Sequence, residues 1–457
     1  MIKNKLLSLF AALACISLVA LSGPARAELA AVGPLDPANG FPLWYQDKAG
    51  TYLELCMDPI ETVAGPLCLR ALPFPNNPVS FPDNFGAEAF WWSATSAITL
   101  PNGGDALLDM AIEAAFSLGE TPAAGDQISF ARMRIRVDTN AGAAGTYRVT
   151  HPYGVTDFVV DAATAGGRAI NHTADVGIQV GVFTGALKGE IGPFLQCVSP
   201  AAPAGFLGDP NVPCTATGSP NNTNVFRVQR ISGPVVTGGA FGTAGNPSDV
   251  IESNSFAIMG KVATKFGASL DQATYTLGRT GSGRVDVYAS TAPGKTLTAS
   301  APGVAVPVQL TPGTTPLPPG KQFGRVFFQG GQVPGPVVVQ NVSDAPATSS
   351  LTVQPVDIVN ITRAQYVIAE NASNPTGTLN VKAKSADLLN APALTVYDGD
   401  GTTLLGAMSA SGSLSMALPI PPSEIVVKSA KGGMARVKVE FVIPPVVAGP
   451  NYMLLQQ

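Results

Sequence analysis

The sequence has little charge, few aromatic residues and almost no histidine. Only 13% of the 457 residues are charged, with 27 Lys and Arg against 31 Asp and Glu, so the net charge is −4. A chain without a basic excess cannot neutralise many phosphates, and we expect no nucleic-acid partner. The hydrophobic content of 46% is too high for a disordered chain. Two histidines are too few for a zinc site built from three.

Motifs that carry a known reaction are also missing. The sequence has no Gly-x-Ser-x-Gly elbow, no His-Glu-x-x-His and no Gly-x-Gly-x-x-Gly that opens a helix. We interpret His151, in Thr-His-Pro-Tyr-Gly, as a structural polar residue, with a catalytic or ligand role as the alternative. Asp398 to Gly401 reads as a hairpin turn, with a weak calcium site as the alternative. We therefore predict no enzymatic activity, no cofactor and no metal.

The N-terminus has the pattern of a secretory signal peptide. Lys3 and Lys5 precede an apolar run from Leu6 to Leu21, and Ala25-Arg26-Ala27 supplies the small residues of a cleavage site. The run is shorter than the ~20 residues of a spanning helix. We predict cleavage after Ala27, no transmembrane segment in the mature chain, and a secreted protein that is extracellular or periplasmic.

Four of the five cysteines lie in the predicted mature chain. An even number in an oxidising compartment indicates disulfides. The local pairing Cys56–Cys68 and Cys197–Cys214 is favoured, because each pair brackets a short loop with Pro and Gly, but the other two connectivities stay open. Zinc is disfavoured, because its ligand cysteines are usually spaced two to four residues apart.

The mature chain shows the period-two pattern of β-strands. Met133, Ile135 and Val137 alternate with Arg132, Arg134 and Arg136, and similar short segments are separated by Gly, Pro, Asn and Asp. Residues 105–118 fit a strand and a helix almost equally, and the strand is favoured because a turn-like Pro-Asn-Gly-Gly precedes them. The expected fold class is all-β.

An internal repeat divides the second half of the chain. Ala273-Thr274-Tyr275 and the strand after Gly283 correspond to Ala364-Gln365-Tyr366 and the strand after Gly377, about 90 residues later. This is close to the ~100 residues of an immunoglobulin-like sandwich. We predict a signal peptide (1–27), an N-terminal disulfide-bearing β-sandwich-like domain (28–265), two immunoglobulin-like modules (266–357 and 358–446) and a tail (447–457).

The N-terminal domain has its own marker of a sandwich. Gly145-Thr146-Tyr147 precedes an alternating strand, as in domains where a tyrosine hydroxyl bonds back to upstream backbone. We predict that role for Tyr147.

Several segments also carry a resemblance to other proteins. The segments that carry the resemblance are Gly40 to Asp47, Gly125 to Gln127, Thr150 to Gly154, Gly192 to Phe194 and Gly208 to Pro210. The chain resembles a set of uncharacterised secreted bacterial β-rich proteins with C-terminal immunoglobulin-like repeats, in which these segments lie in the same order. The resemblance implies export and a β-rich fold, and it carries over no catalytic residue.

Possible ligand-binding residues lie in the N-terminal domain. Trp44 and Trp92 are candidates for stacking on sugar rings, and Arg132, Arg134 and Arg136 could meet an anionic polymer, although such a stripe is more often the wet face of a sheet. We predict a structural or adhesive extracellular protein whose partners are polysaccharide or other surface proteins. The alternative is a carbohydrate-binding or carbohydrate-processing protein that acts through this domain.

Overall fold

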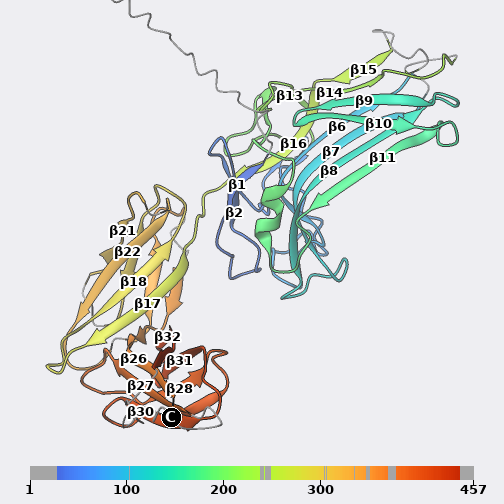
Figure 1. Cartoon of the computed structure of the whole chain (residues 1–457). Coiled ribbons are helices and arrows are strands. Elements are labelled where there is room, and N and C mark those ends of the chain that lie inside the picture. Colours follow the sequence, from blue (N-terminus) through green and yellow to red (C-terminus); the bar gives the residue numbers. More distant parts are fainter. Residues whose placement is uncertain are drawn as a thin grey trace, which may run out of the picture.

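The structure, a computed structural model, is built almost wholly of β-strands. It describes residues 28–101, 103–236, 241, 249–302, 304, 306–316, 318–333, 335–345, 350–368 and 377–442. The predicted signal peptide and tail lie outside these residues. Within them, the chain forms a head domain (strands β1 to β16) followed by two sandwich modules, and module 1 lies between the head and module 2 (Figure 1). The predicted fold class is confirmed.

Two sheets build most of the head domain. The larger has the order β1-β2-β3-β16-β6-β7-β8-β11, with β12 and β13 attached beside β16, and the smaller has the order β10-β9-β14-β15. The elements are β1 (Leu29–Val32), β2 (Trp44–Asp47), β3 (Tyr52–Glu54), β4 (Glu61–Thr62), β5 (Gly65–Pro66), β6 (Ala89–Thr99), β7 (Asp105–Phe116), β8 (Gln127–Thr139), β9 (Gly145–His151), β10 (Gly154–Val160), β11 (Gly167–Val176), the 3-10 helix η1 (Phe183–Lys188), β12 (Gln196–Ser199), β13 (Cys214–Thr217), β14 (Phe226–Arg230), β15 (Val250–Ser253) and β16 (Ser255–Val262).

Period-two alternation produces the core of the head. On β8, Met133, Ile135 and Val137 are buried, whereas the intervening arginines are partly exposed. The buried face packs in one cluster with residues of β9 and β14, such as Val149 and Phe226. Residues 105–116 form the strand β7, so the favoured reading of that segment is confirmed.

Both disulfides have the local pairing that the sequence favoured. Cys56 bonds to Cys68 and Cys197 bonds to Cys214. The first closes a loop that packs, with Phe206 and Met259, as a small apolar cluster separate from the main core.

Each module consists of two sheets, and the strand order is equivalent in the two modules apart from the additional edge strand β21 of module 1. Module 1 has sheets β21-β22-β18-β17-β25 and β20-β19-β23-β24, and module 2 has sheets β30-β27-β26-β33 and β29-β28-β31-β32. The strands of module 1 are β17 (Ser269–Leu277), β18 (Gly283–Ser290), β19 (Leu297–Ser300), β20 (Val308–Gln309), β21 (Thr311–Pro312), β22 (Lys321–Phe328), β23 (Val337–Asn341), β24 (Ser350–Val353) and β25 (Val356–Asp357). Those of module 2 are β26 (Val359–Ile368), β27 (Gly377–Ser385), β28 (Leu394–Asp398), β29 (Leu404–Ala407), β30 (Ser413–Leu418), β31 (Glu424–Ser429), β32 (Met434–Lys438) and β33 (Glu440–Val442).

The repeat therefore reflects two equivalent sandwiches. In each, the last strand pairs in parallel with the first: β25 with β17, and β33 with β26. Each second strand begins at a glycine because an aromatic ring lies against that backbone. A Cβ would lie 2.3 Å from the Phe328 ring at Gly283 and 2.3 Å from the Tyr366 ring at Gly377.

Tyr147 makes the hydrogen bond that the sequence predicted. Its side chain is fully buried, and its hydroxyl donates to the carbonyl oxygen of Ala143, 2.7 Å away. The bond fixes the turn before β9 against the core strand that follows.

Replacement of Tyr147 by Phe should lower the free energy of unfolding of the head by about 1–2 kcal/mol, because it leaves the buried Ala143 carbonyl without its donor. Urea denaturation measures the change. Tyr52→Phe is the matched control, since no hydrogen bond of the Tyr52 hydroxyl is found among the described residues. Equal stability of Tyr147→Phe and wild type would contradict the role of this bond.

Candidate functional site

The structure corrects the expectation that Trp44 and Trp92 bind a ligand. Trp92 is 0% exposed and Trp44 is 5% exposed. The indole N–H of Trp92 donates to the Leu195 carbonyl and that of Trp44 donates to the Phe266 carbonyl, at 3.2 and 3.0 Å. Neither ring offers a face to a sugar. Both rings pack in the protein interior. The alternation of residues along a strand does not show which of its two faces is buried, so the sequence pattern alone could not reveal this.

The arginine stripe lies on the outer face of the large sheet, opposite the core. Arg132 forms ion pairs with Glu113 on β7 and Asp175 on β11, at 2.9 and 2.8 Å, and Arg134 lies 3.6 Å from Asp109. The buried Nε atoms of Arg134 and Arg136 have no hydrogen-bond partner among the described residues. Neighbouring strands thus supply carboxylates to two of the three arginines. Binding of an anionic polymer by Arg132, Arg134 and Arg136 stays a prediction, and the polymer would compete with these carboxylates.

Glu113 is the most perturbed carboxyl group on this face. Its side chain is 1% exposed, and burial raises its pKa to about 8, although Arg132 opposes the rise and Glu88 adds to it. A carboxyl group of this kind could donate a proton near neutral pH. Because it is closed off from solvent, however, it does not form an open catalytic site with Glu88.

The junction between the head and module 1 contains a denser set of polar contacts. The connecting segment, residues 263–268, joins β16 to β17. On the head side, Glu54 accepts hydrogen bonds from the backbone N–H and the hydroxyl of Thr264, at 2.8 and 3.1 Å. On the module side, the buried carboxylate of Asp344 accepts from the N–H groups of Phe266 and Gly267, at 2.7 and 3.1 Å. The connecting segment is therefore bonded to both neighbours.

Aromatic packing closes the same junction. Phe266 and Ala263 of the connecting segment lie in one apolar cluster with Trp44 of the head and Ala292 of module 1. The Tyr52 ring packs edge-on against both Trp44 and Phe266, with centroids 5.0 and 5.4 Å away. These contacts explain why Trp44 is buried although it lies at the end of the domain.

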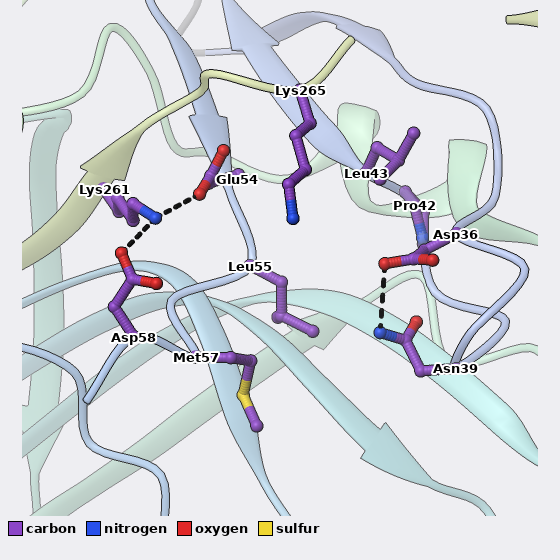
Figure 2. A pocket seen from close by; sticks show the side chains of 10 residues that line it. All are labelled: Asp36, Asn39, Pro42, Leu43, Glu54, Leu55, Met57, Asp58, Lys261 and Lys265. Carbon is purple, nitrogen blue, oxygen red and sulfur yellow. Dashed lines mark hydrogen bonds and ion pairs between the residues drawn. The ribbon is translucent and has the colours of Figure 1, made fainter. Parts of the chain in front are cut away.

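A cavity of about 140 Å³ opens beside this junction (Figure 2). Its polar lining includes Lys261, which forms ion pairs with Glu54 and Asp58, and its floor includes Leu55. The Lys265 side chain points into the opening (Figure 2). The cavity is smaller than the ~300–1,000 Å³ of most ligand sites. We therefore read its ion pairs as part of the junction.

The junction between the two modules also contains a buried carboxylate that accepts a hydrogen bond across the junction. Only Ile358 separates β25 from β26. Leu277, at the end of β17, donates its N–H to the Ala386 carbonyl and accepts from the N–H of Leu388, at 3.0 and 2.8 Å. The buried carboxylate of Asp387 accepts from the Tyr275 hydroxyl at 3.0 Å. Burial and this carboxylate both raise the pKa of Tyr275.

Sequence reasoning missed the three carboxylates that hold these junctions, Glu54, Asp344 and Asp387. Their hydrogen bonds span 210, 78 and 112 residues, so no local pattern indicates them. The sequence does show that no linker separates the predicted domains, which end and begin at adjacent residues, and this is the feature that points to close junctions.

Two kinds of feature, a cluster of metal ligands and a membrane-spanning helix, are not found in the described part of the chain. No group of three or more His, Cys, Asp and Glu side chains there could hold a metal ion. No helix there is long and apolar enough to cross a membrane.

Comparisons with known proteins are sparse. No protein-family model matches the chain, and no curated protein matches it in sequence. A solved structure, the full ectodomain (Ig1–Ig3) of mouse nectin-like molecule 4, is similar at 11% identity over 44% of this chain and 75% of that chain, with a TM-score of 0.15. At this score we draw no argument about function or domain arrangement from the similarity.

His151 lies inside the head rather than in an open site. It is buried at the end of β9, its Nδ1 has no hydrogen-bond partner among the described residues, and burial, with a smaller effect of His172, lowers its pKa to about 4. The unfolded chain, with an ordinary histidine pKa of ~6.5, binds this proton more readily than the folded chain does. The neutral histidine therefore contributes stability that is complete above pH 6.5 and is lost as the pH falls to 4.

We expect His151→Gln to remove this part of the pH dependence. Between pH 7 and pH 4 the wild-type protein should lose roughly 3 kcal/mol more stability than the variant. Urea midpoints of both proteins across this range measure the difference, and the variant controls for carboxylates that titrate in the same window. Parallel pH profiles of the two proteins would show that His151 is not buried in the neutral form.

Proposed function

We propose that this protein is an extracellular spacer of adhesive type, in which the two modules hold the head domain at a fixed distance and direction. The single observation that carries the proposal is the construction of both junctions. Buried carboxylates there accept hydrogen bonds from the connecting backbone or from a buried tyrosine.

The two connections between the domains differ from a flexible linker. Linkers that allow free motion are polar, solvated and rich in Gly and Ser, and few contacts cross them. Here the first connecting segment buries Ala263 and Phe266, and the second connection is a single residue. Bending at either place would expose apolar surface and break charge-assisted hydrogen bonds, each worth about 1.5–3 kcal/mol.

The proposed place outside the cytoplasm rests on the disulfides. Two disulfides fit an extracellular or periplasmic protein. Secretion through residues 1–27 and cleavage after Ala27 remain predictions from the sequence, and so does membership of the secreted bacterial set that the chain resembles.

Carbohydrate binding through the head is the weaker candidate. It is motivated by the aromatic and acidic content of residues 41–120, and the two tryptophans predicted to bind there, Trp44 and Trp92, are part of the core. The absence of enzymatic activity stays a prediction from the sequence.

Loss of the Asp344 carboxylate should loosen the first junction. Asp344→Ala leaves two buried N–H groups without acceptors, at a cost of roughly 2 kcal/mol or more. We expect small-angle X-ray scattering of the wild-type protein to fit one rigid arrangement, and the variant to require an ensemble of head orientations. Proteolytic cleavage between residues 263 and 268 should become faster as well.

The matched control is Asp271→Ala, which removes an exposed ion pair with Lys321 in the same module. It should scatter as wild type does, because exposed pairs contribute little. A wild-type protein that already needs an ensemble of orientations would contradict the proposed function.

A further inference from the structure

Module 1 has an unusual outer sheet face. We name it the aromatic–arginine face and define it by Tyr288 and Arg284 on β18 and by Phe323, Arg325 and Phe327 on β22. These residues alternate with buried ones, such as Val285 and Val326, so their side chains lie on the face opposite the core. Phe327 is 68% exposed and Tyr288 is 41% exposed. The Tyr288 and Phe323 rings are in contact, with centroids 4.8 Å apart.

Comparison with module 2 shows that the fold does not require these rings. The register pairs Tyr288 with Phe323 and Arg284 with Phe327, and the equivalent pairs in module 2 are Lys382 with Ser413 and Thr378 with Ala417. The same sandwich therefore forms with small or polar residues at these positions. Exposed aromatic residues without a role in folding are a mark of an interaction surface.

On this face the carboxylate of Asp286 is buried beneath the two more exposed arginines. Asp286 is buried and accepts from the Nε groups of Arg325 and Arg284, at 2.6 and 3.2 Å. The side chains of Arg284 and Arg325 are themselves more than a third exposed. Each carries five N–H donors, of which Asp286 takes one or two. The exposed charge of the face is therefore positive, held at fixed positions beside the rings.

This chemistry matches a ligand that has carboxylates beside apolar surface. A guanidinium binds a carboxylate through two parallel hydrogen bonds, and aromatic rings pack against the C–H faces of sugars. Five side chains are few for a stable protein–protein interface, which usually involves about 20–30 residues on each side. A polymer with repeated acidic sugars can compensate for a small site through multiple contacts.

We propose that the aromatic–arginine face of module 1 binds an acidic polysaccharide, with Arg284 and Arg325 on its carboxylates and Phe327 and Tyr288 under its sugar rings. The inference rests on the proposed adhesive role and assigns its ligand. It places a candidate binding surface in module 1, whereas the sequence suggested residues of the head domain.

The test is the retention of the full-length protein in gels that contain polygalacturonate, with dextran as the neutral polymer. We expect retention by polygalacturonate only, and its loss as the salt concentration rises, because exposed charges are screened. Arg284→Thr and Phe327→Ala carry the residues that module 2 has at these positions, so the fold should tolerate them. Each should weaken binding about tenfold, the effect of losing one charge-assisted bond or anchoring ring.

Lys382→Ala is the control, because it removes a positive charge from the equivalent face of module 2 and should leave binding unchanged. Absence of retention, or retention that neither Arg284→Thr nor Phe327→Ala weakens, would overturn the inference. Equal retention by dextran would do the same. So would concentration-dependent self-association that Phe327→Ala abolishes, since the face would then join two copies of the chain. Scattering from the unbound protein tests the spacer role separately, so a rigid protein that fails to bind would lose only this inference.

Discussion

The arrangement of this molecule depends on the hydrogen bonds between a buried carboxylate and the backbone that joins its parts. Asp344 accepts from two successive N–H groups of the connecting segment, and Glu54 holds the preceding residue from the head side. An ionised carboxylate in such a place is stable only when its acceptor sites are filled. Movement of the segment would leave the charge buried and unpaired, so the polar groups specify one geometry where apolar contacts alone would allow several.

The same principle applies to Asp286, which is buried beneath Arg284 and Arg325 and accepts hydrogen bonds from both. Glu113 differs, because its buried oxygens lack hydrogen-bond partners among the described residues and burial raises its pKa to about 8, although Arg132 lies beside it. On the outer sheet face of the head, Asp175 pairs with Arg132 and Asp109 lies beside Arg134. In module 1 the carboxylate is buried and the guanidinium groups are not, and aromatic side chains surround them. The two faces have similar residue types but differ in arginine exposure: the Arg132 side chain is 15% exposed, whereas that of Arg284 is 40% exposed.

Much of the fold follows from short-range patterns in the sequence. Alternation along residues 132–137 predicted strands, and the repeat of Tyr275 at Tyr366 predicted the modules. The close spacing of each cysteine pair predicted the disulfides. Each of these patterns is visible in a short stretch of sequence or in its repeat. Tyr147 was identifiable for the same reason, since its partner is four residues away. The burial of Trp44 and Trp92 could not be predicted in this way, because the carbonyl groups that accept from them are 222 and 103 residues away in the sequence. The aromatic–arginine face had a signal that could be read: at equivalent positions one repeat has Arg284 and Tyr288, and the other has Thr378 and Lys382.

If the head and the modules form one rigid arrangement, the distance between the two ends of the molecule is fixed, and a measurement of that distance tests the rigidity most directly. Spin labels attached through Val155→Cys on β10 and Leu404→Cys on β29, both exposed positions, report the distance between the head and module 2 by pulsed electron resonance. Four native cysteines are held in disulfides and do not take the label, and the labelled protein begins at Glu28, so that it lacks Cys15. The account predicts a single narrow distance distribution. A broad distribution, as expected for domains that reorient about a free hinge, would contradict it.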